Sequence, residues 1–409
     1  MSLQGNALVA QSGGPSAVIN NSICGVIETW LDSGRQGKIY AGISGIKGVL
    51  NGDIVDLAAQ RREDVAGLRY TPGAGIFSCR YKVSAVDHEK LISILKKLNI
   101  RYFFYNGGND SMDTAYKTWR AAADAGWEMR VIGVPKTIDN DLPFCDHSPG
   151  FGSAAKYIAA TVRETGIDLE SVSTKNKVTI LEAMGRDAGW LTAASALSRR
   201  FPDEAPHLIY LPEVPFYKES FLSDVERVYK QLGYCYVVVS EGISDENGEY
   251  CFTSGAVDAF GHVQLSGVGI ALKDMVEREI GIRARCNTLG TAQRAAMHFA
   301  SKTDADEAYM AGKTAVEYAL AGKSGVMVTL QRASDDPYRC VCSEVELDKV
   351  ANIEQKLPVE WINEQHNYVT DEFIRYARPL IEGEVAIPMK HGLPNYVRLD
   401  FSKGRVSID

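Results

Sequence analysis

The chain has 409 residues, of which 45% are hydrophobic and 23% charged, as in ordinary globular proteins. At roughly 150 residues per domain, this length predicts two or three domains. The net charge of −8 gives no overall basic surface for nucleic acid or an anionic membrane, and no apolar run approaches the ~18 residues of a membrane span. The eight cysteines are scattered without a CxxC pair, so we expect reduced thiols and a cytoplasmic location.

Predicted strands and helices alternate along the chain. Short apolar runs predict strands at residues 6–10, 101–105, 130–134, 178–181, 207–211, 236–240 and 326–330. Apolar residues at helical spacing predict helices at residues 17–31, 88–98, 111–125, 153–164, 189–198, 218–232, 268–279, 291–301 and 304–321. Asp87 is a candidate N-cap for the second of these helices.

This alternation predicts parallel-type sheets with helices on both faces. The strand–helix units are too numerous for one sheet, so we expect two Rossmann-like, three-layer α/β/α domains. The first would comprise residues 1–147, to which residues 291–335 return, and the second residues 148–290. Residues 336–409 are less regular and are expected to form a mostly helical C-terminal extension that serves as a cap or interface element.

The most informative segment is residues 135–141 (PKTIDND), directly after the predicted strand 130–134. Acidic groups in this position lie at the C-terminal edge of a strand, where open α/β sheets bind ligands. Asp139 and Asp141, beside Lys136, can activate a hydroxyl, hold a metal and meet a phosphate within one turn. The alternative is an ordinary turn rich in Asp and Asn.

Two glycine-containing loops also follow predicted strands. Gly13 and Gly14 can let backbone N–H groups approach an anion at a helix N-terminus. In the second loop, Gly108 permits close approach of a phosphate, and Asn109 and Asp110 can contact Mg²⁺ or its waters. A plain strand-to-helix turn and an Asx-type helix cap are the respective alternatives.

Polar groups follow strands in the second predicted domain as well. Arg186 comes after strand 178–181, and an arginine there suits bidentate recognition of phosphate. Glu241 comes after strand 236–240 and can accept hydrogen bonds from sugar hydroxyls. A group of arginines surrounds a glycine-containing turn and fits a sugar phosphate, although single arginines are usually solvated: Arg283, Arg285 and Arg294.

Taken in order, these motifs resemble the 6-phosphofructokinase family over roughly residues 5–330. The motifs are Ser12-Gly13-Gly14, residues 107–111 (GGNDS), residues 135–141, Met184-Gly185-Arg186 and Glu241-Gly242. The resemblance implies the phosphofructokinase fold and phosphoryl transfer to the 1-hydroxyl of fructose 6-phosphate, in glycolysis or gluconeogenesis. Asp139 is similar to the general base of the family, and Lys136 and Asp110 would complete the catalytic group.

The resemblance further implies three sets of binding residues. The sugar phosphate would contact Thr137, Ile138, Asp139, Met184, Gly185, Arg186, Glu241, Arg285, Thr291 and Arg294, with Arg285 and Arg294 on the 6-phosphate. The donor would contact Gly13, Gly14, Arg80, Gly108 and Lys136. A cofactor Mg²⁺ would lie near Asn109 and Asp110.

Two positions are implied to choose the phosphoryl donor. ATP-using members of the family carry glycine where this chain has Asp110 and Lys136, whereas pyrophosphate-using members resemble this chain at both. A carboxylate at Asp110 would repel the α-phosphate of a nucleotide, enough for roughly thousandfold discrimination. Lys136 adds a compact cation for pyrophosphate. The resemblance therefore implies a pyrophosphate-dependent enzyme.

Three departures from the family pattern keep alternatives open. Asn109 stands in place of a metal-associated aspartate, Thr291 in place of a histidine or phenol, and Lys177 in place of an arginine that reaches a neighbouring subunit. The alternatives are a different acceptor such as a seven-carbon sugar phosphate, an ATP-dependent 6-phosphofructokinase, and a catalytically silent sugar-phosphate-binding subunit. Shared sites in the family imply a homodimer or homotetramer, and no nucleic-acid or membrane partner is expected.

Overall fold

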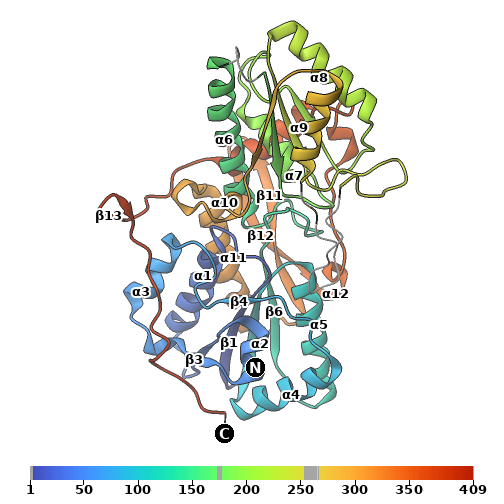
Figure 1. The fold of residues 1–409 in the computed structure, drawn as a ribbon. Coiled ribbons are helices and arrows are strands. Elements are labelled where there is room, and N and C mark those ends of the chain that lie inside the picture. Colours follow the sequence, from blue (N-terminus) through green and yellow to red (C-terminus); the bar gives the residue numbers. More distant parts are fainter. Residues whose placement is uncertain (1–2, 173–176, 253–264, 266, 409) are drawn as a thin grey trace.

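The computed structural model describes residues 3–172, 177–252, 265 and 267–408, and it forms two lobes stacked end to end (Figure 1). The first lobe is built on a sheet of eight strands in the order β12-β11-β6-β5-β1-β2-β3, with β4 paired to β1. Its strands are β1 (Asn6–Ser12), β2 (Ile39–Gly42), β3 (Ile54–Asp56), β4 (Ser78–Cys79), β5 (Ile100–Gly107), β6 (Arg130–Pro135), β11 (Val326–Asp335) and β12 (Tyr338–Glu346). All pairings are parallel except β2–β3 and β11–β12.

Helices cover both faces of this sheet because consecutive residues of its central strands are apolar, which makes both faces apolar. Leu8 of β1 faces a core shared with α2 (Gly45–Asn51), α4 (Ala85–Lys97) and α5 (Asn109–Asp124). Val9 faces the opposite core, which is shared with α1 (Ile19–Asp32), α3 (Arg62–Gly67) and α11 (Lys302–Leu320). Helices α1 and α11 pack closely, since a Cβ added to Gly312 would lie 1.9 Å from Ser22 O.

The second lobe is built on four parallel strands in the order β10-β7-β9-β8. They are β7 (Val178–Ala183), β8 (Leu208–Tyr210), β9 (Cys235–Ser240) and β10 (Ala284–Thr288). Helices α6 (Phe151–Ser171) and α7 (Trp190–Ala194) share a core with one face, and α8 (Lys218–Leu232) and α9 (Val268–Glu279) share a core with the other. The short helix α10 (Ala292–Ala295) begins the return to the first lobe.

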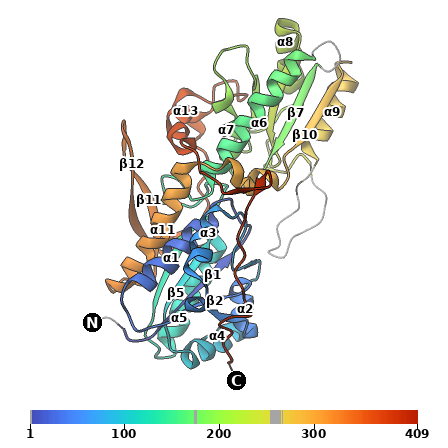
Figure 2. The ribbon, with the colours of Figure 1, turned by 90° about the vertical axis from the view of Figure 1, so that its left-hand side faces the viewer.

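Residues after β12 connect the two lobes. Helix α12 (Leu347–Val350) lies beside α5, and α13 (Asp371–Ala377) buries Phe373 and Tyr376 in the second-lobe core (Figures 1 and 2). The chain then returns along the first lobe through the hairpin β13 (Met389–Lys390) and β14 (Leu393–Pro394). Near its end, Asp56 N–H donates to Gly404 O at 2.7 Å.

The expected architecture of parallel sheets with helices on both faces is confirmed. The expectation of a mostly helical extension at residues 336–409 is wrong, because β12 pairs with β11 in the first sheet and the helices that follow it are short. Helices α8 and α9 have the predicted bounds, whereas the predicted helix 291–301 is interrupted and contains only α10 and a single 3-10 turn, Met297–Phe299. The N-cap of α4 is Ser84 rather than Asp87, because Asp87 returns a hydrogen bond to Ser84 in a capping box. In the part of the chain that the structure describes, no helix combines the length and apolarity needed to cross a bilayer.

Candidate functional site

The first three predicted loops meet at one edge of the first sheet. In that sheet β5 and β2 flank β1, so the strand order reverses at β1, and ligands of open α/β sheets bind outside such a reversal. Gly13 and Gly14 follow β1, Gly108 to Asp110 follow β5, and Lys136 to Asp141 follow β6. The parallel pairing of β1, β5 and β6 therefore gathers these loops at the carboxyl ends of three neighbouring strands.

Three cationic side chains converge on the glycines after β1. Lys136 Nζ donates to Gly14 O at 2.8 Å, and a Cβ on Gly13 would lie 3.2 Å from the same nitrogen. A Cβ on Gly14 would lie 2.7 Å from Arg294 Nη1 and 3.7 Å from Arg80 Nη2. We call Gly13, Gly14, Arg80, Lys136 and Arg294 the cationic cradle. A side chain at either glycine would intrude on it.

The charges in the cradle perturb one another. Burial, assisted by Arg80 and Arg294, lowers the pKa of Lys136 to about 8, although Asp139 and Asp141 oppose the shift. Burial and Arg80 likewise lower the pKa of Arg294. Like charges held this close are stabilised by a polyanion between them, so the cradle has the properties of a phosphate or pyrophosphate site.

The turn after β6 holds Asp139 in a fixed conformation. Asp139 N–H donates to Thr137 Oγ1 at 3.0 Å, and Asn140 adopts a positive φ of 57°. The Asn140 side chain fixes the turn on both sides, because Oδ1 accepts from Ser148 N–H at 2.9 Å and Nδ2 donates to the Tyr376 hydroxyl at 2.8 Å. Tyr376 belongs to α13, and sequence reasoning missed it because nothing in its own neighbourhood indicates a contact with residues 236 positions earlier.

The environment of Asp139 suits a general base at neutral pH. Burial and the negative charges of Asp141, Glu241 and Glu354 raise the pKa of Asp139 to about 7, against the opposing effect of Lys136. Burial also raises the pKa of Asp141. A base with a pKa near the working pH combines availability of the ionised form with sufficient proton affinity.

The second lobe meets the first beside Asp139, because the neighbouring Ile138 packs in the second-lobe core and the charge of Glu241 helps to raise the pKa of Asp139. Gly185 N–H approaches Glu241 Oε1 at 3.4 Å, and Ser240 Oγ donates to Gly185 O at 2.5 Å. Met184 N–H donates to Oε1 of the buried Gln293 at 3.0 Å. Sequence reasoning did not select Gln293, since a single glutamine carries no motif, yet it ties the loop after β7 to α10.

Several predicted site residues lie apart from this group. Arg285 projects from β10 with 47% of its side chain exposed and lies 3.6 Å from Asp168, and Thr291 is exposed at the N-cap of α10. The Ile138 side chain is buried in the second-lobe core. Arg294, expected beside Arg285, lies in the cationic cradle instead.

Two carboxylates that follow β5 and β6 have the chemistry of a magnesium site. Asp110 is exposed in the first turn of α5, and Asp141 Oδ1 is buried without a hydrogen-bond partner among the described residues. Mg²⁺ is usually held by one or two carboxylates together with phosphate oxygens and water, so these two groups fit it. Asn109 differs, because its amide Nδ2 donates to Ile353 O.

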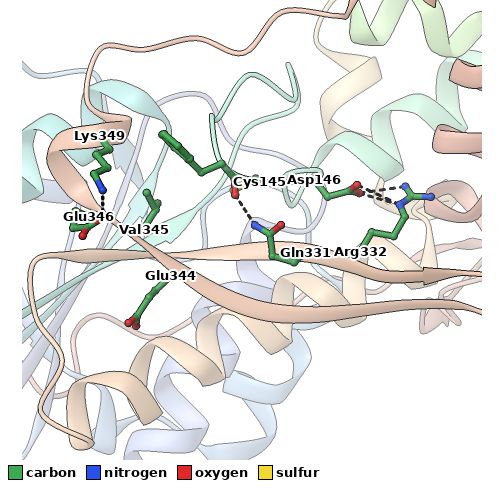
Figure 3. Close-up of a pocket in the computed structure, with 9 residues that line it drawn as sticks. Cys145, Asp146, Gln331, Arg332, Glu344, Val345, Glu346 and Lys349 are labelled. Atoms are coloured by element: carbon green, nitrogen blue, oxygen red, sulfur yellow. Dashed lines mark hydrogen bonds and ion pairs between the residues drawn. The ribbon is translucent and has the colours of Figure 1, made fainter.

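We call residues 136–141, the turn after β6, the catalytic turn. A cavity of about 610 Å³ lies next to the residues that follow it (Figure 3). Its walls are formed by residues 144–146 and by the β11–β12 hairpin with α12, where Arg332 pairs with Asp146 at 3.2 Å. None of the predicted site residues lines it. The cavity is therefore separate from the site.

A group of potential metal ligands lies near this cavity, and it comprises the buried His147 and Glu307 and the half-buried Cys340. His147 bonds through Nδ1 to Asp146 Oδ2 at 2.8 Å and through Nε2 to Glu307 Oε2 at 2.6 Å. Because both ring nitrogens of His147 are engaged by carboxylates, we assign the group a structural role.

Comparison with known proteins places this geometry in a family. The family model described as Phosphofructokinase matches residues 6–319. The chain is 44% identical over 403 residues to a pyrophosphate–fructose 6-phosphate 1-phosphotransferase from Halomonas elongata, covering 97% of this chain and 96% of that protein. A relative of the same name from Methylococcus capsulatus is 44% identical over 401 residues, with 96% of each chain covered. The crystal structure of a pyrophosphate-dependent phosphofructokinase from Marinobacter aquaeolei superposes with a TM-score of 0.91 at 42% identity, covering 100% of this chain and 99% of that one.

Proposed function

The chain belongs to the phosphofructokinase family, and we propose that it transfers a phosphoryl group reversibly from pyrophosphate to the 1-hydroxyl of fructose 6-phosphate. The products are fructose 1,6-bisphosphate and phosphate. The observation that carries the proposal is the placement of Lys136, which crosses from the catalytic turn to Gly14 O at 2.8 Å in a cradle of three cations. Relatives of this name match nearly the whole chain.

On the donor side, the cradle binds pyrophosphate. Lys136, Arg80 and Arg294 neutralise its oxygens, and the glycine backbone of the loop after β1 lets the anion approach closely. As the bridging bond breaks, negative charge grows on the departing phosphate. Cations already in place stabilise that charge without reorganisation.

On the acceptor side, Asp139 accepts the proton of the 1-hydroxyl. The loop after β7 and Glu241 orient the sugar phosphate, so that its hydroxyl oxygen faces the terminal phosphorus of pyrophosphate in line with the bond that breaks. Phosphoryl transfer needs mostly positioning and electrostatic stabilisation. The leaving phosphate resembles the transferred group, which makes the reaction readily reversible.

Asp110 and Asp141 are the groups that would hold Mg²⁺. When bound, this ion supplies charge neutralisation and orientation of the pyrophosphate oxygens. Asp141 Oδ1 supports the assignment, because it has no hydrogen-bond partner in the part of the chain that the structure describes.

The family resemblance and the exposed position of Arg285 support two further proposals. Since Arg285 does not join the site of its own chain, we propose a homodimer or homotetramer in which it serves a neighbouring site. The eight free cysteine thiols suit a reducing, cytoplasmic compartment.

Donor choice by Asp110 can be tested directly. Purified protein is assayed with fructose 6-phosphate and Mg²⁺, with pyrophosphate or ATP as donor, and fructose 1,6-bisphosphate is measured by a coupled aldolase reaction. We expect turnover with pyrophosphate and little with ATP, and turnover with ATP alone would contradict the donor assignment. Because Asp110 is exposed and therefore screened by solvent, Asp110→Gly should raise the ATP-to-pyrophosphate ratio about tenfold rather than thousandfold. Asp113→Gly, on the same helix, is the matched control and should leave the ratio unchanged.

A further inference from the structure

Residues 351–357, which we call the strap, cross the catalytic site from one lobe to the other. The strap follows α12, which lies beside α5 (Figure 1). On the first lobe it makes two hydrogen bonds. Asn109 Nδ2, at the start of α5, donates to Ile353 O, and Gln355 N–H donates to Asp141 O at 2.7 Å. The strap therefore joins the donor-side helix to the catalytic turn.

The same strap is also bonded to the second lobe. Trp190 Nε1, at the start of α7, donates to Gln355 O at 3.1 Å. Leu357 N–H donates to Glu213 Oε1 at 3.1 Å, and the Leu357 side chain is 1% exposed in the second-lobe core. Gln355 thus bridges the catalytic turn and α7 through its own backbone, and the strap lies beyond residues 6–319 that match the family model.

The residue at position 109 determines whether the bond to Ile353 O can form. An asparagine side chain carries an N–H donor, whereas an ionised aspartate only accepts hydrogen bonds. An aspartate at position 109 would place a carboxylate oxygen against Ile353 O, and two acceptors repel each other. The observed bond to Ile353 therefore requires the amide of Asn109.

We propose that the strap positions the Asp139–Asp141 turn between the two lobes, and that Asn109 is its anchoring residue rather than a metal ligand. This inference rests on the proposed phosphoryl transfer and adds a positioning element to the same site. Movement of Asp139 by about 1 Å is enough to slow phosphoryl transfer about hundredfold. A bond from the strap backbone to Asp141 O, two residues away, controls that position directly.

The variant Asn109→Asp separates the two roles of this residue because they predict opposite results. If Asn109 anchors the strap, the variant loses the bond to Ile353. The Gln355 amide should then exchange with solvent at least about tenfold faster in hydrogen-exchange mass spectrometry, since a lost hydrogen bond of about 1.4 kcal/mol corresponds to tenfold. The kcat should fall about ten- to a hundredfold, while KM for pyrophosphate and for fructose 6-phosphate changes little.

If Asn109 is instead a metal ligand, the added carboxylate should tighten binding of Mn²⁺, measured by electron paramagnetic resonance with pyrophosphate present. Tighter Mn²⁺ binding with undiminished kcat, or unchanged exchange at Gln355, would overturn the proposal. Asn352→Asp is the matched control, because it adds the same charge at an exposed neighbouring position on the strap and should leave exchange at Gln355 unchanged. Hydrogen exchange is measured without substrate. An inactive wild-type protein would therefore contradict the proposed function but not the proposed role of the strap.

Discussion

The hydrogen bonds of Tyr376 allow a quantitative test of whether the C-terminal extension holds the catalytic turn. The Tyr376 hydroxyl donates to Asp146 O at 2.6 Å and accepts from Asn140 Nδ2 at 2.8 Å. Tyr376 and Asn140 are 9% and 2% exposed. Tyr376→Phe removes the hydroxyl and preserves the ring that packs against Trp190 and Trp361. The variant therefore leaves the Asn140 amide and the Asp146 carbonyl unpaired.

The expected loss of stability of the turn follows from the unpaired Asn140 amide and Asp146 carbonyl. A buried polar group without a partner costs about 1–3 kcal/mol, so with two such groups the free energy of locally opening the turn should fall by about 2–6 kcal/mol. This corresponds to about 30- to 20,000-fold faster exchange of the Ser148 amide, which donates to Asn140 Oδ1 at 2.9 Å. Displacement of Asp139 should lower kcat about ten- to a hundredfold. We call the hydrogen bonds of Tyr376 with Asn140 and Asp146 the clamp. Because Lys136 contacts Gly14 O and is not part of the clamp, KM for pyrophosphate should stay nearly constant.

Hydrogen-exchange mass spectrometry of the peptide covering residues 140–150 measures the opening, and steady-state kinetics measures kcat. Tyr217→Phe serves as the control, because Tyr217 is 47% exposed and lies at the N-cap of α8. Wild-type kcat despite faster exchange would refute the view that the turn depends on this clamp. Unchanged exchange would refute the energetic reasoning itself.

Three further predictions concern the catalytic turn and the cradle. Asp139→Asn preserves the shape of the side chain but removes its ability to accept the proton, so kcat should fall about 10²- to 10⁴-fold. Calorimetry should find an unchanged affinity for fructose 6-phosphate. Substantial residual turnover would exclude Asp139 as the base. Asp139 acts only when ionised, and its pKa is raised to about 7, so kcat/KM should decline as the pH falls through 7. It should also decline above about pH 8, where Lys136 loses its proton. A value of kcat/KM that stays constant from pH 6 to 9 would contradict both assignments. Gly14→Ala places a Cβ 2.7 Å from Arg294 Nη1. It should raise KM for pyrophosphate about tenfold, which corresponds to the weakening of one charge-assisted hydrogen bond. An unchanged KM would show that Arg294 does not contact the donor.

Helices with one clear apolar face could be predicted from the sequence, while several short or half-exposed strands could not. Helices α8 and α9 have apolar residues at regular helical spacing, and their bounds match the prediction. Strand β12 was missed because its residues alternate between half-buried and exposed and include several charges. It is stabilised by antiparallel pairing with β11, which local composition does not indicate. Strand β10 was read as part of an arginine-rich turn for the same reason.

The residues of the site also fall into those that the sequence predicts and those that it does not. Loops such as residues 13–14 and 136–141 could be selected because glycines and carboxylates directly after apolar runs have few other uses. Contacts made by Tyr376, Gln293 and the strap could not be selected. Each of these is an ordinary residue or backbone group whose partner lies more than a hundred residues away, so only the packed chain brings the pair together.

The distribution of charge explains why Asp139 can be both buried and reactive. Lys136 lies between a group of cations and a group of carboxylates. On one side it forms the cationic cradle with Arg80 and Arg294. On the other side, Asp141, Glu241 and Glu354 raise the proton affinity of Asp139. A polyanion in the cradle would increase that affinity further, because its charge adds to theirs and offsets the cations. Proton affinity at the base would therefore be greatest when the donor is present, at the stage when the proton of the sugar hydroxyl must be removed.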